Sequence, residues 1–204
     1  DTVADAATGK LRHRRTQAAL ANIAHWDKLV LLGDPGSGKS TLLRFLAFCL
    51  AQARQQPEGG WLERLAWQRE EVVSDDSIAE EVWSGGREKQ NRLLRQEEEA
   101  RPEIEHVVCN WPVGVLIPVF IELRDFARSS FDPHSPLAIW RFVAQRLRDA
   151  DLGEAVESLR QQAQQGQVLF LLDGVDEVPV AERKRVWQAI GAMAAGVYGG
   201  NRWV

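Results

Sequence analysis

The sequence is poor in the residues that cross-link small proteins or bind metals in them. Its 204 residues include two cysteines, Cys49 and Cys109, too few for a disulfide-rich secreted scaffold. The four histidines lack the spacing of a metal site. No apolar run reaches the roughly 18 residues of a transmembrane helix, and no secretory leader pattern opens the chain. These absences favour a cytoplasmic protein without a membrane partner.

The composition is that of one globular domain with a mildly acidic balance. Hydrophobic residues make up 45% and charged residues 26%, and the length is sufficient for one full core. The net charge of −4 gives no signal for direct nucleic-acid binding. The basic group at residues 12–15 is interpreted as a solvated helix face.

A glycine-rich loop is the most informative motif. Residues 33–40, Gly-Asp-Pro-Gly-Ser-Gly-Lys-Ser, match the phosphate-binding pattern G-x-x-x-x-G-K-[ST]. The apolar run at 28–32 predicts a buried strand before it, and helical spacing predicts a helix over 39–54 after it. Backbone N–H groups of such a loop and the helix N-terminus bind phosphate. Lys39 would contact the β- and γ-phosphates, and the Ser40 hydroxyl would ligate Mg²⁺.

The residues predicted to bind the nucleotide are Gly33, Asp34, Pro35, Gly36, Ser37, Gly38, Lys39, Ser40 and Thr41.

A second motif supplies carboxylates. The apolar run at 168–172 predicts a buried parallel strand, and Asp173 follows at its carboxyl end, where ligands bind in open α/β sheets. Asp173 is therefore predicted to share Mg²⁺ with Ser40. Asp176 and Glu177 follow closely enough to polarise an attacking water, so they are predicted to be catalytic together with Lys39.

Four segments together resemble the NACHT-type NTPases of the STAND class of signalling ATPases. Asp-Gly-Val-Asp-Glu at 173–177 resembles their extended Walker B motif, and residues 33–43 resemble their form of the phosphate-binding loop. Residues 117–126 resemble their intermediate strand with its L-R-D ending. Residues 201–204 resemble the start of the next core strand. The resemblance covers residues 12–50 and 113–204 and fits poorly between them.

The resemblance implies Mg²⁺-dependent binding and slow hydrolysis of ATP, with GTP as an alternative. It also implies a nucleotide-controlled signalling switch, self-association of the full-length protein and, in bacteria, a role in defence. Arg124, in the L-R-D segment, is a further candidate to face the γ-phosphate, with a structural ion pair as the alternative.

Other functions remain as alternatives. A nucleotide-stabilised, non-catalytic interaction module would use the same loop without turnover. A GTPase would need D-x-x-G and N-K-x-D motifs, which are absent. An ABC ATPase would place a glutamate directly after Asp173, where Gly174 stands. A P-loop kinase is disfavoured by the Asp-x-x-Asp-Glu spacing.

The expected fold is α/β, with a doubly wound, mostly parallel P-loop NTPase sheet flanked by helices. Residues 1–204 are expected to form one nucleotide-binding domain, interrupted by a helical insertion at 57–112. Residues 202–204 predict the start of a strand between the two motif strands, so the chain is expected to be a fragment with a truncated sheet. Pro118 suits an edge position or the start of its strand because it lacks a backbone donor.

Further helices are predicted from apolar periodicity and caps at residues 10–26, 136–147, 154–165 and 180–195. Ser135 is the expected N-cap of the second of these, with Pro136 as its first residue, and Gly166 is the expected C-cap of the third. Within the insertion, a short amphipathic helix is expected at 61–67, a capped helix from Ser77 and a charged helix over 87–99. Trp61, Trp67 and Trp83 make the insertion a candidate surface for a protein partner.

Overall fold

The computed structural model describes residues 2–4, 11–13, 18–73 and 103–204. Contacts divide the chain into two units, one of residues 1–66 with 110–204 and one of residues 67–109. The first unit contains the sheet, the helices and both sequence motifs, and it is described first.

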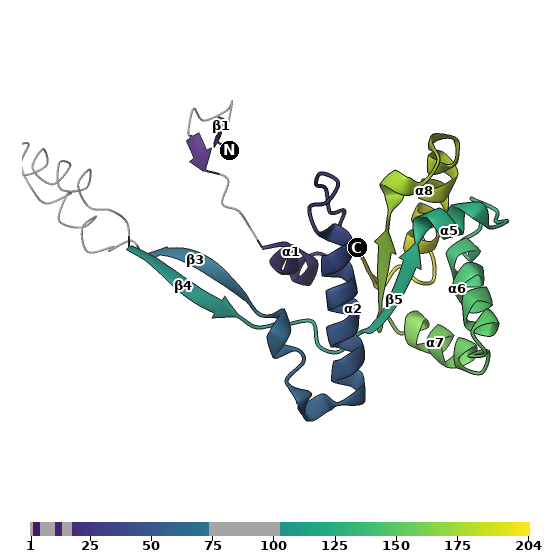
Figure 1. The fold of residues 1–204 in the computed structure, drawn as a ribbon, viewed down its shortest axis with the longest axis horizontal. Coiled ribbons are helices and arrows are strands. Elements are labelled where there is room, and N and C mark those ends of the chain that lie inside the picture. The colour runs from purple at the N-terminus through teal and green to yellow at the C-terminus, as the bar shows by residue number, and fades with distance from the viewer. Residues whose placement is uncertain (1, 5–10, 14–17, 74–102) are drawn as a thin grey trace, which may run out of the picture. The chain divides into compact units, whose positions relative to one another are not determined.

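The first unit is built on a parallel sheet of three strands in the order β5-β6-β7 (Figure 1). These strands are β5 (Ile117–Glu122), β6 (Val168–Asp173) and β7 (Arg202–Trp203). On its other side β7 contacts the segment that precedes the glycine loop (residues 33–40): Lys28 forms a parallel bridge with Trp203, and the Leu29 N–H donates to the Trp203 carbonyl at 2.9 Å. The predicted position of residues 202–204, between the two motif segments, is confirmed.

The predicted strand over residues 28–32 is wrong beyond its first residues. Only Lys28 joins the sheet, and the side chains of Val30 and Leu32 are 59% and 90% exposed. A strand is held by its neighbour's backbone groups, and β7 is two residues long. Trp203 in β7 therefore forms backbone hydrogen bonds only with Asp27 and Leu29 of this segment.

Pro118 lies at the sheet edge, as expected. The Ile117 N–H donates to Gln167 across the β5–β6 ladder at 2.9 Å, so the neighbouring position, Pro118, faces away from β6. Among the described strands β5 pairs only with β6. Proline there removes a donor from the open edge, which discourages pairing with another chain.

Helices cover both faces of the sheet. On one face lies α2 (Lys39–Gln55), whose Leu43, Leu46, Cys49 and Leu50 are buried. Burial raises the pKa of the Cys49 thiol, an effect that the charge of Arg64 partly opposes, as expected for a core cysteine.

The other face carries α5 (Leu123–Arg128), α6 (Ala138–Asp149), α7 (Ala155–Gln164) and α8 (Val180–Ala195). The expectation of an α/β fold with a parallel sheet is therefore confirmed.

Strand β6 is the centre of the core. Val168, Leu169, Phe170 and Leu171 are all fully buried, as a parallel strand covered on both faces requires. The Phe170 ring stacks on the indole of Trp203 in β7, with 4.3 Å between ring centroids. Side chains alternate along the strand, so Leu169 and Leu171 face α2, on the side to which Asp173 also points.

The N-terminal region differs from the predicted helix over 10–26. Residues of β1 (Thr2–Ala4) and β2 (Leu11–His13) form an antiparallel pair, and the helix α1 spans only Ala19–His25. The Arg202 guanidinium donates to the carbonyls of Ile23, Ala24 and Trp26. It thereby satisfies acceptors that the end of α1 leaves unpaired and ties this helix to β7.

Caps fix the ends of two further helices. Helix α7 ends in a Schellman motif, in which the Gly166 N–H donates to Ala163 and the Gln167 N–H donates to Gln162. Gly166 has a φ of +74°, which confirms it as the predicted glycine cap. At α6 the Ser135 hydroxyl accepts from the Leu137 N–H, but the helix begins at Ala138 and not at the predicted Pro136.

The second unit is an antiparallel ribbon of β3 (Trp67–Val73) and β4 (Glu103–Cys109). The predicted helical insertion over 57–112 is therefore wrong at these residues, where β-branched side chains in both segments favour strands. Residues 57–66 belong to the first unit and contain two short 3₁₀ helices, η1 (Pro57–Gly59) and η2 (Glu63–Leu65), in place of the helix expected at 61–67.

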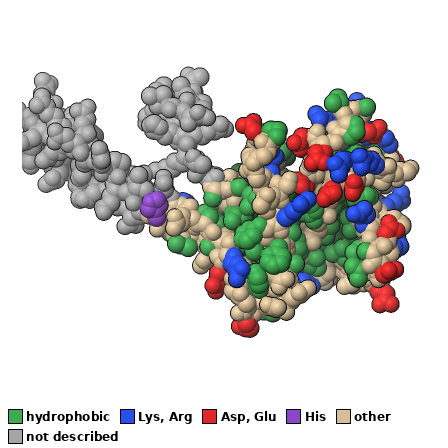
Figure 2. Space-filling view, in the orientation of Figure 1, with side chains coloured by type: hydrophobic (Ala, Val, Ile, Leu, Met, Phe, Trp, Pro, Cys, Tyr) green, Lys and Arg blue, Asp and Glu red, His purple; other side chains and the backbone are tan. Residues whose placement is uncertain are grey.

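The helices expected from Ser77 and over 87–99, and Trp83, lie outside the described residues. Trp61 packs within its own unit, edge-on against Phe48 and beneath the Arg64 guanidinium. Figure 2 shows hydrophobic side chains gathered over α2, where Phe45 and Phe48 are 41% and 51% exposed.

Asn201 generates the first prediction. Its buried amide donates to the Ala163 and Tyr198 carbonyls and accepts from the Val168 N–H, which joins α7 to the start of β6. Asn201→Ala leaves these groups buried and unpaired, so the free energy of unfolding should fall by about 2 to 4 kcal/mol. Urea denaturation measures the change. The control is Asn110→Ala, at an exposed position. An equal loss of stability in both variants would contradict this structural role of Asn201.

Candidate functional site

The glycine loop turns sharply into α2. Gly36 and Gly38 have φ values of +82° and +86°, a region that residues with a Cβ rarely adopt. The Ser37 N–H donates to the Asp34 carbonyl at 3.1 Å and closes the turn. Gly38 is the N-cap of α2, and the first helical bond runs from the Leu42 N–H to its carbonyl. The loop therefore lies against the positive end of a 17-residue helix.

Lys39 folds back over this loop. Its ammonium donates to the carbonyls of Gly33 at 2.6 Å and Asp34 at 3.0 Å and to the Ser37 hydroxyl at 3.3 Å. An ammonium has three donors, and all three have acceptors here. The positive charge is thus held at the mouth of the loop by groups that a phosphate oxygen can replace.

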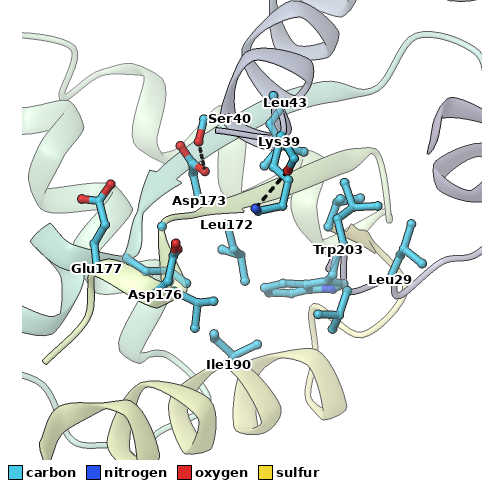
Figure 3. A pocket seen from close by; sticks show the side chains of 18 of the residues that line it. Leu29, Lys39, Ser40, Leu43, Leu172, Asp173, Asp176, Glu177, Ile190 and Trp203 are labelled. Atoms are coloured by element: carbon cyan, nitrogen blue, oxygen red, sulfur yellow. Dashed lines mark hydrogen bonds between the residues drawn. The ribbon is translucent and has the colours of Figure 1, made fainter. Parts of the chain in front are cut away.

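Ser40 and Asp173 come together from distant parts of the sequence. The Ser40 hydroxyl donates to Asp173 Oδ1 at 2.7 Å (Figure 3). Ser40 occupies the first turn of α2, and Asp173 is the last residue of β6. The expected proximity of these two residues is confirmed, because α2 begins beside the carboxyl end of the central strand.

A cavity of about 560 Å³ opens beside these residues. This volume lies within the range of small-molecule sites. Of the residues predicted for the site, those that line it are Pro35, Gly36, Ser37, Gly38, Lys39, Ser40, Thr41, Asp173, Asp176 and Glu177. Gly33 and Asp34 lie outside the lining, where their carbonyls accept from Lys39.

The far part of the cavity is apolar. In Figure 3 Leu29, Leu172, Ile190 and Trp203 lie below the polar group formed by Lys39, Ser40 and Asp173. Trp187, at the rim, is 45% exposed. The periodicity of residues 180–195 predicted the helix but not the cavity beside it, because periodicity identifies a buried face and not a cavity within it.

The acidic turn (residues 174–177) follows β6. Gly174, with a φ of +77°, starts the short 3₁₀ helix η3 (Val175–Glu177), so Asp176 and Glu177 lie beside the cavity. Arg183 in α8 donates to the carbonyls of Asp176 at 2.9 Å and Val178 at 3.0 Å. Arg183 therefore fixes the backbone of this turn, a role that no sequence motif indicated.

Arg124 contacts the same turn through a side chain. Its guanidinium lies 3.2 Å from the Glu177 carboxylate, and the two side chains are 47% and 58% exposed. In Figure 2 basic and acidic side chains are intermixed over α5 and α8, the two helices that flank this turn. Of the two alternatives for Arg124, the structure contains the ion pair.

The donor set near Ser40 fits Mg²⁺ held partly by a ligand. A hydroxyl and a carboxylate in contact are hard oxygen donors, and Mg²⁺ commonly takes one or two protein oxygens together with phosphate and water. Within the described residues no three His, Cys, Asp or Glu side chains group closely enough to hold a metal by themselves. The site therefore suits a metal that arrives with phosphate.

Comparisons with known proteins give no relative: no family model, no curated protein and no solved structure matches this chain. None of the helices in the described part of the chain is long and apolar enough to cross a membrane. Inference about function therefore starts from the site itself.

The loop glycines generate the second prediction. A Cβ on Gly38 would meet no atom within 4 Å, so only backbone strain opposes Gly38→Ala, and stability should fall by about 1 to 2 kcal/mol. A Cβ on Gly191, in α8, would also meet no atom within 4 Å, and the backbone there is helical. Gly191→Ala should therefore stabilise by about 0.5 to 1 kcal/mol. Thermal unfolding measures the melting temperature of both variants. Equal changes of the same sign would refute backbone strain at Gly38.

Proposed function

We propose that this chain binds a nucleoside triphosphate with Mg²⁺ and hydrolyses it slowly, ATP being the preferred nucleotide and GTP the alternative. The observation that carries the proposal is the contact of Ser40 with Asp173 beside the Lys39 ammonium, at the wall of one cavity. A hydroxyl, a carboxylate and an ammonium grouped at a helix N-terminus complement a metal-bound phosphate chain.

Phosphate binding is assigned to the loop. The backbone N–H groups at 36–40 would face the β- and γ-phosphates, and Lys39 would exchange its carbonyl contacts for phosphate oxygens. Ser40 and Asp173 would hold Mg²⁺, which would supply charge neutralisation on the phosphates. The apolar part of the cavity around Ile190 and Trp203 gives this site an apolar floor.

Hydrolysis is assigned to the acidic turn. Asp176 and Glu177 lie beside the cavity on η3, where a carboxylate can orient a water and accept its proton. The water oxygen bonds to the terminal phosphorus as the bond to the bridging oxygen breaks, which releases diphosphate nucleotide and inorganic phosphate. One base on an exposed turn is consistent with slow turnover.

The wider role is a nucleotide-controlled switch for signalling and self-association, in line with the NACHT resemblance, and prokaryotic defence is one setting for it. Lys39 supports this proposal, because its ammonium is held by loop carbonyls that phosphate oxygens can displace. Exchange of these contacts would couple occupancy of the site to the conformation of the loop.

The ion pair of Glu177 with Arg124 also favours a second candidate, a nucleotide-stabilised interaction module without turnover. In this case the Arg124 guanidinium would neutralise Glu177 without directing it to a water, and nucleotide would remain intact. Product analysis separates the two: released phosphate supports the ATPase, and intact bound triphosphate supports the module. Transfer to an acceptor would instead indicate a kinase, and a preference for GTP would indicate a GTPase.

Lys39→Ala is the first test. Calorimetry of ATP, ADP and GTP with and without Mg²⁺ should show Mg²⁺-dependent ATP binding, and Lys39→Ala should weaken it by about 100-fold or more, since the phosphates lose a charge-assisted donor. The control is Lys184→Ala, an exposed lysine of α8. Undiminished ATP binding by Lys39→Ala would refute the proposed site.

Asp176→Asn and Glu177→Gln test the base. Each keeps the shape of the side chain and removes its proton-accepting charge, so single-turnover hydrolysis should fall about 100-fold in the variant that lacks the base, with ATP binding retained. Glu157→Gln, an exposed change in α7, is the control. If both site variants turn over ATP at the unsubstituted rate, neither carboxylate handles the water.

A further inference from the structure

The Arg124–Glu177 pair follows from the order of the strands. Strands β5 and β6 are parallel neighbours, and Glu122 pairs in register with Asp173 at their carboxyl ends. Leu123 starts α5 directly after β5, so Arg124 lies on its first turn. Glu177 lies at the end of η3, four positions after Asp173. The two side chains therefore meet above the shared end of adjacent strands.

This pair contributes little to stability. Both partners are about half exposed, and solvent screening leaves exposed ion pairs with a small contribution to stability. The neighbouring basic residues of α5 and α6 have a different partner: Arg128 and Arg146 both lie 3.9 Å from Asp125. Arg124 is directed instead to a carboxylate that lines the cavity.

The acidic turn is thus held at two points. Arg183 binds its backbone through the Asp176 and Val178 carbonyls, and Arg124 binds its last side chain. A free glutamate on an exposed turn would sample several rotamers, and fixing such a side chain has an entropic cost. An arginine in contact with Glu177 removes part of that freedom before substrate binds.

We propose that Arg124 is a positioning residue, which holds the Glu177 carboxylate in the orientation that accepts the proton of the attacking water. This inference rests on the proposed hydrolysis of ATP and assigns Arg124 no direct contact with phosphate. It replaces the expectation that Arg124 faces the γ-phosphate.

The test compares Arg124→Gln, Arg124→Lys and the control Arg128→Gln in the full chain. Arg124→Gln should lower kcat about tenfold, with the Kd for ATP and the melting temperature unchanged, because a positioned base loses its orientation while the phosphate contacts remain. Arg124→Lys keeps the charge without the planar fork and should recover part of the rate. Arg128→Gln should leave kcat unchanged.

A double-mutant cycle separates positioning from other roles. In a Glu177→Gln background, Arg124→Gln should have no further effect, since its target is already gone. Additive losses, or weakened ATP binding at constant kcat, would overturn the inference and point to a phosphate contact. If the parent chain is active and Arg124→Gln has the same kcat, the positioning role is refuted while the proposed hydrolysis stands. A parent chain that binds ATP without turnover would refute positioning and hydrolysis but leave nucleotide binding standing.

Discussion

The burial of strand β6 is the constraint on which the rest of the structure depends. Four consecutive residues of this strand are inaccessible to solvent, because β5 and β7 pair with its edges and helices cover both faces. A strand enclosed in this way has one register, and Asp173 at its end has one position. The Ser40 contact, the acidic turn and the start of α8 all take their places from that fixed end.

Charge at the site is balanced internally. Lys39 is bound by loop oxygens, Glu177 by Arg124, and Asp173 accepts from a hydroxyl. The contacts of Lys39 and Asp173 are exposed and can therefore be exchanged for contacts with a ligand at little cost. By contrast, Asn201 and Arg202 bind backbone carbonyls from within the fold and hold β6, α1 and β7 together. The site thus combines a rigid support with replaceable polar contacts.

Sequence reasoning worked best where a residue's role is local. The positive φ values of Gly38 and Gly166, the continuous apolar run of β6 and the span of α8 were each encoded by a few adjacent residues. It failed for the strand at 28–32 and the helical insertion. In the first case the pattern was apolar but the neighbouring strand was too short to pair with it. In the second, charged residues flanking β3 and β4 obscured a ribbon that long-range pairing stabilises.

The sequence alone determined the glycine loop, the helix after it and a buried strand ending in a carboxylate, because backbone conformation and periodicity are properties of short segments. Only the tertiary structure decided that β7 lies between β6 and Lys28, that Arg183 holds the acidic turn, and that Arg124 contacts Glu177. These partners are far apart in the chain. Their proximity depends on the order of strands in the sheet, which is set by burial of the whole core and not by any local pattern.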